Sequence, residues 1–178
     1  MKKIYQIVLL PILFIVLVSC MEKKNSKLKE LTQAEQEGLS LSDTSLKKVK
    51  KTNAEWKKVL TSNQYHILRE QGTEAPFHNA YHDNHKKGNY FCAGCKLPLF
   101  NSKTKFDSGT GWPSFYAPIE KNRVIEVIDE SHGMVRGEIV CARCDGHLGH
   151  VFNDGPNPTG LRYCMNSGSL IFLAENKK

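Results

Sequence analysis

Cys92-Ala93-Gly94-Cys95 is the first of two Cys-x-x-Cys knuckles in this chain, and Cys141-Ala142-Arg143-Cys144 is the second. Each knuckle presents two thiolates on one tight turn, so the two together can close a tetrahedral four-cysteine site. Two disulfides are the competing interpretation for an exported protein, but a pair within one Cys-x-x-Cys is usually a catalytic redox couple. The spacing therefore predicts one structural zinc ion per chain, held by Cys92, Cys95, Cys141 and Cys144. Such a closed site stabilises a small domain by crosslinking it, and it has no open coordination position for catalysis.

Short apolar segments, separated by Pro, Gly and Asn, surround the knuckles at residues 90–91, 124–128, 137–140 and 170–173. They are typical of strands between turns, and residues 127–140 indicate a hairpin. Residues 53–60 and 62–70 have helical spacing, and each segment begins with an N-cap type residue. We therefore expect a mainly β fold, a small antiparallel β-sheet domain with two short N-terminal helices, spanning residues 52–175.

The N-terminus has the shape of an export signal. Lys2 and Lys3 precede a nearly unbroken apolar run, residues 4–18, which is short for a membrane-spanning helix of roughly 20 apolar residues. Leu17-Val18-Ser19-Cys20 resembles a bacterial lipobox. We expect residues 1–19 to be a lipoprotein signal peptide and Cys20 to carry the lipid that anchors the protein to a membrane. A plain signal peptide or an uncleaved anchor is the alternative. Each interpretation places the domain in the bacterial cell envelope, outside the cytoplasm.

Residues 20–51 are rich in lysine and poor in aromatic residues, which predicts a flexible tether rather than a phosphate-binding arm. The formal net charge of +7 becomes 7 − 2 = +5 without Lys2 and Lys3. A zinc ion held by four thiolates has a net charge of about −2, which would leave about +3. The excess of positive charge is therefore modest. Together with export, it argues against a nucleic-acid partner.

Cys164 is the remaining cysteine once four are assigned to metal and Cys20 to lipid. A buried structural cysteine is the ordinary interpretation, because free cysteine behaves as a small hydrophobe. Arg162 would favour the thiolate electrostatically, and His147 and His150 could supply protons if the fold brings them close. A low pKa and exposure make a thiol reactive. Cys164 is thus a candidate redox nucleophile.

Four motifs in this order resemble the methionine sulfoxide reductase B family, over residues 56–173. The motifs are residues 105–116 around Gly111-Trp112-Pro113-Ser114-Phe115, Ser131-His132-Gly133-Met134, residues 146–156 beginning Gly146-His147-Leu148-Gly149-His150, and Arg162-Tyr163-Cys164-Met165-Asn166-Ser167. The resemblance implies a β-rich fold, commonly with zinc on the two knuckles. It also implies reduction of the R epimer of methionine sulfoxide, free or more often in oxidised proteins.

The same resemblance assigns the site residues. Cys164 corresponds to the attacking cysteine, and Trp112 and Phe152 to the substrate-binding side. The polar shell consists of His147, His150, Asp154, Arg162 and Asn166. A protonated histidine, His147 or His150, would protonate the sulfoxide oxygen while the Cys164 thiolate attacks sulfur. Asn166 and Asp154 would hold the histidines, and Arg162 would help to keep Cys164 ionised.

One position departs from the pattern of many members of the family. Thr110 stands where they have a second cysteine, which resolves the sulfenic acid as an internal disulfide. We expect a one-cysteine cycle, in which a thioredoxin-like protein or a small-molecule thiol attacks the Cys164 sulfenic acid of a monomeric enzyme. Two alternatives of another class remain: a lipid-anchored zinc-ribbon binding module without catalysis, and a structural lipoprotein that kept the fold and lost catalysis.

Overall fold

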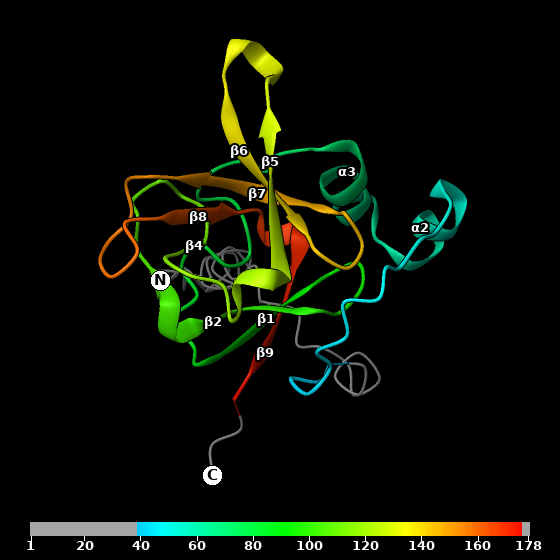
Figure 1. The fold of residues 1–178 in the computed structure, drawn as a ribbon, viewed down its shortest axis with the longest axis horizontal. Coiled ribbons are helices and arrows are strands. Elements are labelled where there is room, and N and C mark those ends of the chain that lie inside the picture. Colours follow the sequence, from blue (N-terminus) through cyan, green and yellow to red (C-terminus); the bar gives the residue numbers. More distant parts are fainter. Residues whose placement is uncertain (1–38, 176–178) are drawn as a thin grey trace, which may run out of the picture. The chain divides into compact units, whose positions relative to one another are not determined.

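The computed structural model describes residues 39–175. Within this range the chain forms two antiparallel sheets, shown in Figure 1. The three-stranded sheet has the order β2 (Pro98–Asn101), β1 (Gly88–Cys92), β9 (Leu170–Ala174). The six-stranded sheet has the order β3 (Lys105–Phe106), β4 (Ser114–Phe115), β8 (Arg162–Met165), β7 (His147–Phe152), β6 (Arg136–Cys141), β5 (Val124–Asp129). The predicted mainly β class is confirmed.

Two short helices precede the sheets, as predicted. They are α2 (Asn53–Val59) and α3 (Ser62–Glu70). Each begins with a capping box, in which the N-cap threonine side chain accepts a backbone N–H three residues on and that residue's side chain returns to the cap backbone. The pairs are Thr52 with Glu55 and Thr61 with Gln64. These reciprocal bonds satisfy N–H groups that a helix leaves free, which explains why such short helices start where they do.

The predicted hairpin is formed by β5 and β6, which are joined through the 3₁₀ turn η4 (Ser131–Gly133). It projects from the other strands in Figure 1 (yellow). Three further 3₁₀ turns, η2 (Ser102–Thr104), η3 (Lys121–Arg123) and η5 (Ser167–Ser169), precede β3, β5 and β9.

An aromatic cluster forms the centre of the core between the two sheets. Phe100 of β2 stacks on Phe115 of β4 with ring centroids 4.5 Å apart, and Tyr90 of β1 meets Phe115 edge to face at 5.0 Å. All three side chains are fully buried. Burying a side chain of this size contributes about 2–3 kcal/mol relative to leaving it in water. One face of the six-stranded sheet therefore packs against the three-stranded sheet. The opposite face of the six-stranded sheet is the one that can carry a functional site.

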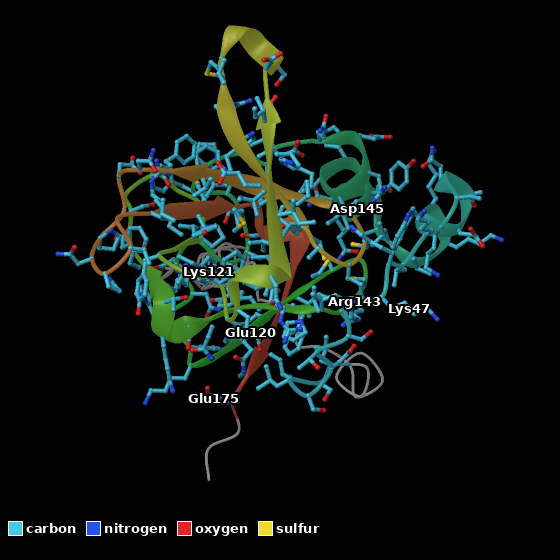
Figure 2. The ribbon with its side chains drawn as sticks, viewed as in Figure 1. Lys47, Glu120, Lys121, Arg143, Asp145 and Glu175 are labelled. Atoms are coloured by element: carbon cyan, nitrogen blue, oxygen red, sulfur yellow. The ribbon has the colours of Figure 1, made fainter. Side chains whose placement is uncertain are left out.

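Part of the predicted tether lies against the second cysteine knuckle. The guanidinium of Arg143 donates to the backbone oxygen of Ser45 at 2.8 Å and forms an ion pair with Asp43 at 2.8 Å. The backbone N–H of Val49 donates to the Arg143 carbonyl at 2.9 Å. Figure 2 labels Arg143 on the side of the domain where Lys47 and Asp145 also lie. Residues 43–49 thus run along the domain.

The remaining N-terminal predictions fall outside the described residues. They concern the signal peptide at residues 1–19, the lipid on Cys20, and the tether up to residue 38. Among residues 39–175, no helix is long and apolar enough to cross a membrane.

Candidate active site and metal centre

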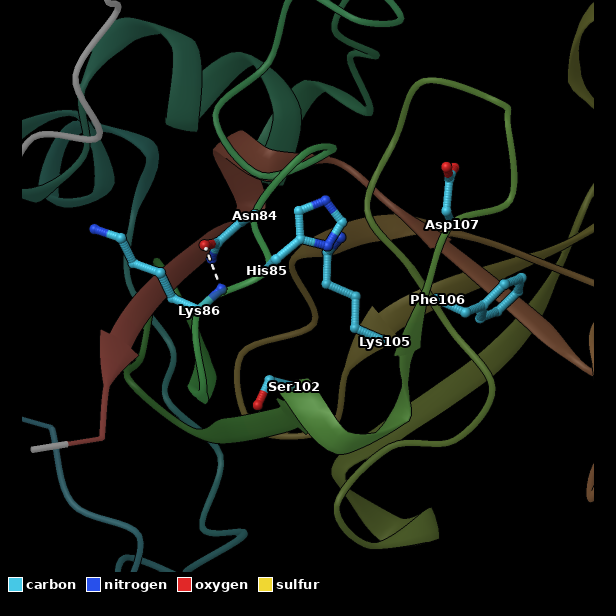
Figure 3. Close-up of a pocket in the computed structure, with 7 residues that line it drawn as sticks. All are labelled: Asn84, His85, Lys86, Ser102, Lys105, Phe106 and Asp107. Carbon is cyan, nitrogen blue, oxygen red and sulfur yellow. Dashed lines mark hydrogen bonds between the residues drawn. The ribbon is translucent and has the colours of Figure 1, made fainter. Parts of the chain in front are cut away.

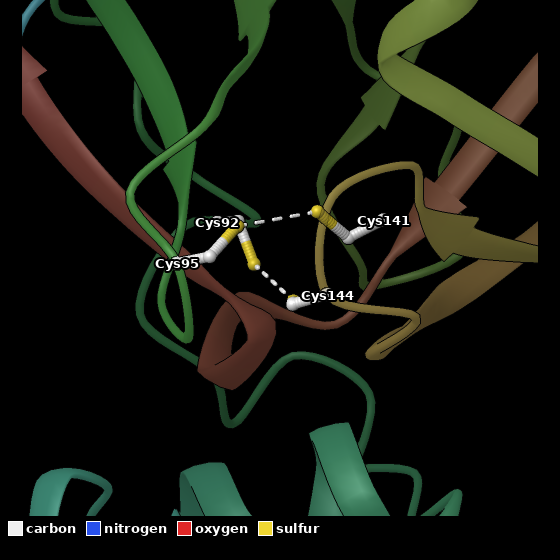
Figure 4. A group of neighbouring side chains, drawn as sticks. All are labelled: Cys92, Cys95, Cys141 and Cys144. Atoms are coloured by element: carbon white, nitrogen blue, oxygen red, sulfur yellow. Dashed lines mark hydrogen bonds between the residues drawn. The ribbon is translucent and has the colours of Figure 1, made fainter. Parts of the chain in front are cut away.

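The four knuckle cysteines come together at one end of the two sheets. Cys92 ends β1 and Cys141 ends β6, so each sheet contributes one knuckle. Figure 4 shows the four side chains converging. Their sulfur atoms all lie within 4.8 Å of one another. Two contacts join different knuckles, Cys92 to Cys144 at 3.6 Å and Cys95 to Cys141 at 3.5 Å.

These distances decide between the two interpretations of the knuckles. A disulfide needs a sulfur separation of about 2.05 Å, and all four cysteines are free thiols in the structure. A tetrahedron with metal–sulfur bonds of about 2.3 Å has edges of about 3.8 Å, close to the observed contacts. The predicted four-cysteine cluster is confirmed as a site that can hold a metal ion.

The two knuckles are built alike. The N–H of the first cysteine donates to the carbonyl five residues on, Cys92 to Leu97 and Cys141 to Gly146, at 2.8 and 2.9 Å. A residue in the left-handed region follows each second cysteine, Lys96 with φ 65° and Asp145 with φ 56°. The buried indole of Trp56 from α2 lies beside the first knuckle.

The chemistry of the cluster also favours a cation. Hydrogen bonds from Cys144, Cys92 and Cys95 lower the pKa of Cys141 far below its usual range, whereas hydrogen bonding chiefly with Cys141 raises the pKa of Cys92 and Cys95. Without a cation, one thiolate is therefore stabilised at the expense of its neighbours. A divalent ion would stabilise all four thiolates together.

The face of the six-stranded sheet that points away from the aromatic core carries the second centre. Strand register places Glu138 of β6, His150 of β7, Cys164 of β8 and Ser114 of β4 directly opposite one another in one row. Directly paired residues of antiparallel strands project to the same face. The row therefore brings a thiol, an imidazole and a carboxylate, each from a different strand, onto one surface.

A β-bulge in β7 adds His147 to this surface. In a regular strand, residues three apart point to opposite faces. The pairing with β6 shifts at this point, because Ile139 pairs with Gly149 while Val140 pairs with His147, so Leu148 is the extra residue. The bulge brings the two imidazoles to the same side, with ring centroids 5.4 Å apart.

Each histidine has its own carboxylate partner, and neither acid was predicted from the sequence. His147 Nδ1 lies 2.6 Å from Glu138 Oε1, and both side chains are buried. His150 Nε2 lies 2.8 Å from Asp129 Oδ2, which also accepts a hydrogen bond from Arg136 at 2.7 Å. Burial lowers the pKa of His147, opposed by its bond to Glu138. The available signal was the hairpin itself, because both acids belong to it.

Cys164 lies on a half-buried stretch of β8, beside a pocket of about 180 Å³. The pocket is lined by Thr73, Trp112, Arg136, Gly149, His150, Phe152, Cys164, Met165 and Asn166. Burial raises the pKa of Cys164, while a hydrogen bond to Thr110 and the charge of Arg162 lower it. Arg162 thus acts in the predicted direction, but burial outweighs it.

Trp112 and Asn166 are held together through Glu74. The indole Nε1 donates to the Glu74 carbonyl at 3.0 Å, and the Glu74 N–H donates to Asn166 Oδ1 at 3.2 Å. The Asn166 amide nitrogen then lies 3.5 Å from His147 Nε2. Of the two residues expected to hold the histidines, Asn166 does contact His147.

Asp154 pairs with Arg162 and with neither histidine. Its two carboxylate oxygens accept from Nε and an Nη atom of Arg162, each at 2.8 Å. The guanidinium also lies over the Phe152 ring, 4.3 Å from its centroid. This bidentate ion pair lowers the pKa of Asp154 and fixes Arg162 beside Cys164. The expectation that Asp154 holds the histidines is therefore corrected.

A different small pocket, of about 120 Å³, lies beside β3 and shares no residue with the Cys164 pocket. Figure 3 shows its lining, with the Lys86 N–H bonded to Asn84 Oδ1 at 3.3 Å. The Lys105 amine there donates to the His82 carbonyl at 2.9 Å, and His85 pairs with Asp83. Lys105 and His85 are thus already engaged by neighbouring groups.

Comparison with known proteins identifies relatives of the whole β domain. The family model described as the SelR domain matches residues 60–174. A peptide methionine sulfoxide reductase MsrB from Pseudomonas putida (strain GB-1) is 59% identical over 122 residues, which cover 68% of this chain and 93% of that protein. The proteins of the same name from Agrobacterium fabrum and Leptospira interrogans are 57% and 58% identical. They align over 74% and 71% of this chain and 98% and 97% of their own lengths.

Proposed function

Because the chain belongs to the SelR-domain family of peptide methionine sulfoxide reductases, MsrB, we propose that it reduces the R epimer of methionine sulfoxide, mainly in proteins, to methionine. Family membership makes the protein an oxidoreductase. One observation carries the more detailed proposal: Cys164, His150 and Trp112 line one pocket. A methyl sulfoxide has an apolar methyl group and a polar S–O bond, and such a pocket offers a partner for each.

In the first step the Cys164 thiolate attacks the sulfoxide sulfur, and a histidine protonates the oxygen. Thiolate, sulfoxide and one proton give cysteine sulfenic acid and methionine, so Cys164 is oxidised by two electrons as the sulfoxide is reduced. His150 is the better placed donor, because it lines the Cys164 pocket. His147 is more deeply buried, and its ring is held between Glu138 and Asn166. Its proposed role is therefore to support the site, and His150 donates the proton.

The second step uses an external thiol. Thr110 lies 3.8 Å from the Cys164 sulfur, at the position where the family resemblance places a resolving cysteine, and a hydroxyl cannot resolve a sulfenic acid. A thioredoxin-like protein or a small-molecule thiol therefore attacks Cys164–SOH, releases water and leaves a mixed disulfide. A second thiol restores Cys164.

The metal is zinc in this proposal, one ion per chain, and its role is structural. Four thiolates on two knuckles are a typical zinc ligand set, and they leave no open coordination position. When bound, zinc supplies a crosslink between the ends of β1 and β6. No catalytic step involves it, because the ligands lie on a different part of the fold from the Cys164 pocket.

The location is proposed from the sequence alone. The apolar run and Leu17-Val18-Ser19-Cys20 support cleavage after residue 19 and lipidation of Cys20. The enzyme would then be tethered to a membrane of the bacterial envelope, with its domain outside the cytoplasm. Mass spectrometry of the N-terminal peptide, with a Cys20→Ala control, tests this. An unlipidated, uncleaved chain would contradict it.

The activity is tested with peptides carrying either epimer of methionine sulfoxide, a dithiol reductant, and native or Cys164→Ser protein. We expect turnover of the R epimer only, abolished in the variant. Turnover of neither epimer by the folded native protein would support the binding or structural alternatives instead.

The one-cysteine cycle needs a separate measurement. Protein treated with the sulfoxide in the absence of thiol should accumulate Cys164 sulfenic acid, or its further oxidation products, detectable by mass and by a sulfenic-acid trapping reagent. A stoichiometric intramolecular disulfide involving Cys164 would contradict this cycle.

A further inference from the structure

The polar groups behind Cys164 form a continuous chain that the reaction described above does not use. Thr110 Oγ1 lies 3.8 Å from the Cys164 sulfur. Ser108 Oγ lies 2.8 Å from Thr110 Oγ1 and 2.7 Å from Ser114 Oγ. The last two distances are typical of O–H···O hydrogen bonds. Three hydroxyl groups are therefore linked behind the sulfur, and the fully buried Ser114, the cross-strand partner of Cys164, also hydrogen-bonds with it.

The backbone fixes this arrangement from two directions. Ser114 is the cross-strand partner of Cys164 between β4 and β8. Thr110 is next to Gly111, which has φ 85° and whose Cβ, if present, would lie 2.7 Å from the Phe77 backbone nitrogen. The Phe77 N–H also donates to the Gly111 carbonyl at 2.8 Å. The loop that carries Thr110 is therefore held against the domain.

Each hydroxyl can donate one hydrogen bond and accept two, so the chain has two consistent directions. With a neutral thiol, the S–H donates to Thr110, Thr110 to Ser108, and Ser108 to Ser114. Ser114 then donates to the Trp112 carbonyl, 3.3 Å away. With a thiolate, the three donors reverse, and Thr110 donates to the sulfur. No heavy atom has to move.

We propose that Thr110, Ser108 and Ser114 form a hydroxyl chain that stabilises the ionised Cys164 by reversing its hydrogen bonds when the thiol loses its proton. This inference rests on the proposed role of Cys164 as the nucleophile. It assigns a positive role to Thr110, at the position where the family resemblance places a resolving cysteine. Thr110 touches the reacting sulfur and is a catalytic residue, Ser108 positions it, and Ser114 contacts both Ser108 and Cys164.

The charge of Arg162 also acts on Cys164, and two further side chains that line the pocket must stay constant in the test. Arg162 comes from the same strand, Arg136 from β6 and His150 from β7. The hydroxyl chain opposes the burial that raises the pKa of Cys164, and removing Thr110 Oγ1 leaves the charges in place. The effect of the chain can therefore be separated from theirs.

The test follows alkylation of Cys164 by iodoacetamide between pH 6 and 11 in the full chain loaded with zinc, with the Cys164 peptide quantified by mass spectrometry. Thr110→Val, which keeps the side-chain shape, should move the midpoint up by about one pH unit. Thr110→Ser should restore it. Ser108→Ala should give a smaller shift in the same direction.

Thr159→Val is the matched control, because Thr159 Oγ1 donates to the Tyr116 carbonyl and lines a different pocket. Its midpoint should equal that of the native protein. The proposal is overturned if Thr110→Val leaves the midpoint unchanged, or if Thr159→Val shifts it equally. If Thr110→Val does not fold, an unchanged midpoint in Ser108→Ala overturns the proposal. Alkylation needs no sulfoxide, so a protein with the expected midpoints but no reductase activity would refute only the proposed function.

Discussion

The residues that set the chemistry of this site are supported by hydrogen-bonding partners that do not line the Cys164 pocket. Glu138 is the clearest case, because its buried carboxylate accepts from His147 and from the Gln71 amide at 3.2 Å. A hydrogen bond to a buried charge is worth more than one between neutral groups, and a partner left unpaired costs more still. The orientation of His147 therefore depends on a residue that never meets the substrate.

Replacing Glu138 by Gln should lower the free energy of unfolding by about 1–3 kcal/mol. The amide would face both the Gln71 amide and the protonated His147 nitrogen, so at least one donor would lose its acceptor. Urea unfolding at neutral pH measures the change. Glu126→Gln on the exposed neighbouring strand is the control, and we expect it to have little effect. Equal losses in the two variants would show that Glu138 has no special role.

The lowered pKa of His147 predicts a pH dependence of stability. Between the folded pKa and the ordinary value of 6.5, the unfolded chain binds more protons than the native protein. The contribution of His147 to the free energy of unfolding is therefore fully present above about pH 6.5. It is lost as the pH drops toward the folded pKa. The slope of unfolding free energy against pH, measured from pH 7.5 to 5.5, should be smaller in His147→Asn. An unchanged slope would refute the prediction.

Elements differ in how well the sequence predicts them. Capping residues and helical spacing indicated both helices, and apolar segments indicated β1, β5, β6 and β9. The strands β3 and β4 have two residues each, too few for any alternation to show. In β7 the bulge and the glycine at 149 interrupt the regular pattern. These strands form because their neighbours pair with them, and sequence patterns do not contain that information.

The same limit applies to the site. Cys164 was indicated as the cysteine left over once the others were assigned, and the resemblance of the motifs to the family indicated Trp112 and the two histidines. Asp129 and Glu138 lie in a hairpin where surface acids are ordinary, and only the strand register brings them to the histidines. Asp154 was recognised, but its partner could not be known without the turn that returns the chain to Arg162.

The bulge in β7 gives a prediction at the level of the element. A Cβ on Gly149 would lie 2.1 Å from the Cys164 carbonyl oxygen. This oxygen is a backbone atom, which cannot move aside as the end of a flexible side chain can. Gly149→Ala should therefore separate β7 from β8 and reduce kcat/KM by more than tenfold, with lower stability. Steady-state kinetics and thermal unfolding measure this.

Gly133→Ala, in the hairpin turn, is the control for this substitution. Its φ is 70°, so alanine is strained by about 1–2 kcal/mol, but a Cβ there has no heavy atom within 4 Å. Activity close to native is expected. If Gly149→Ala is as active as Gly133→Ala, the close approach of the two strands is not needed for the site.

At the scale of the whole molecule, the cysteine cluster connects the two sheets. A bound ion would crosslink residues far apart in the chain, and such crosslinks stabilise small domains whose cores are limited. The segment at residues 43–49 is fixed to the same region through Arg143. Loss of the ion should therefore affect both sheets and this segment together.

Metal analysis of the purified protein should give about one zinc per chain, and a chelator should lower the midpoint of thermal unfolding. Cys92→Ser should have the same effect without a chelator. Cys164→Ser is the control, because it removes a thiol without touching the cluster, and its zinc content should be unchanged. A metal-free protein with two disulfides would contradict the assignment.

The chain has two tryptophans, and each lies at one of the two centres. Trp56 packs beside the first cysteine knuckle, with the Arg69 guanidinium 5.3 Å from its ring centroid, and Trp112 lines the Cys164 pocket. Intrinsic fluorescence can therefore follow the centres one at a time. Emission from Trp56 alone, in Trp112→Phe, reports the loss of metal. Emission from Trp112 alone, in Trp56→Phe, reports the arrival of a sulfoxide.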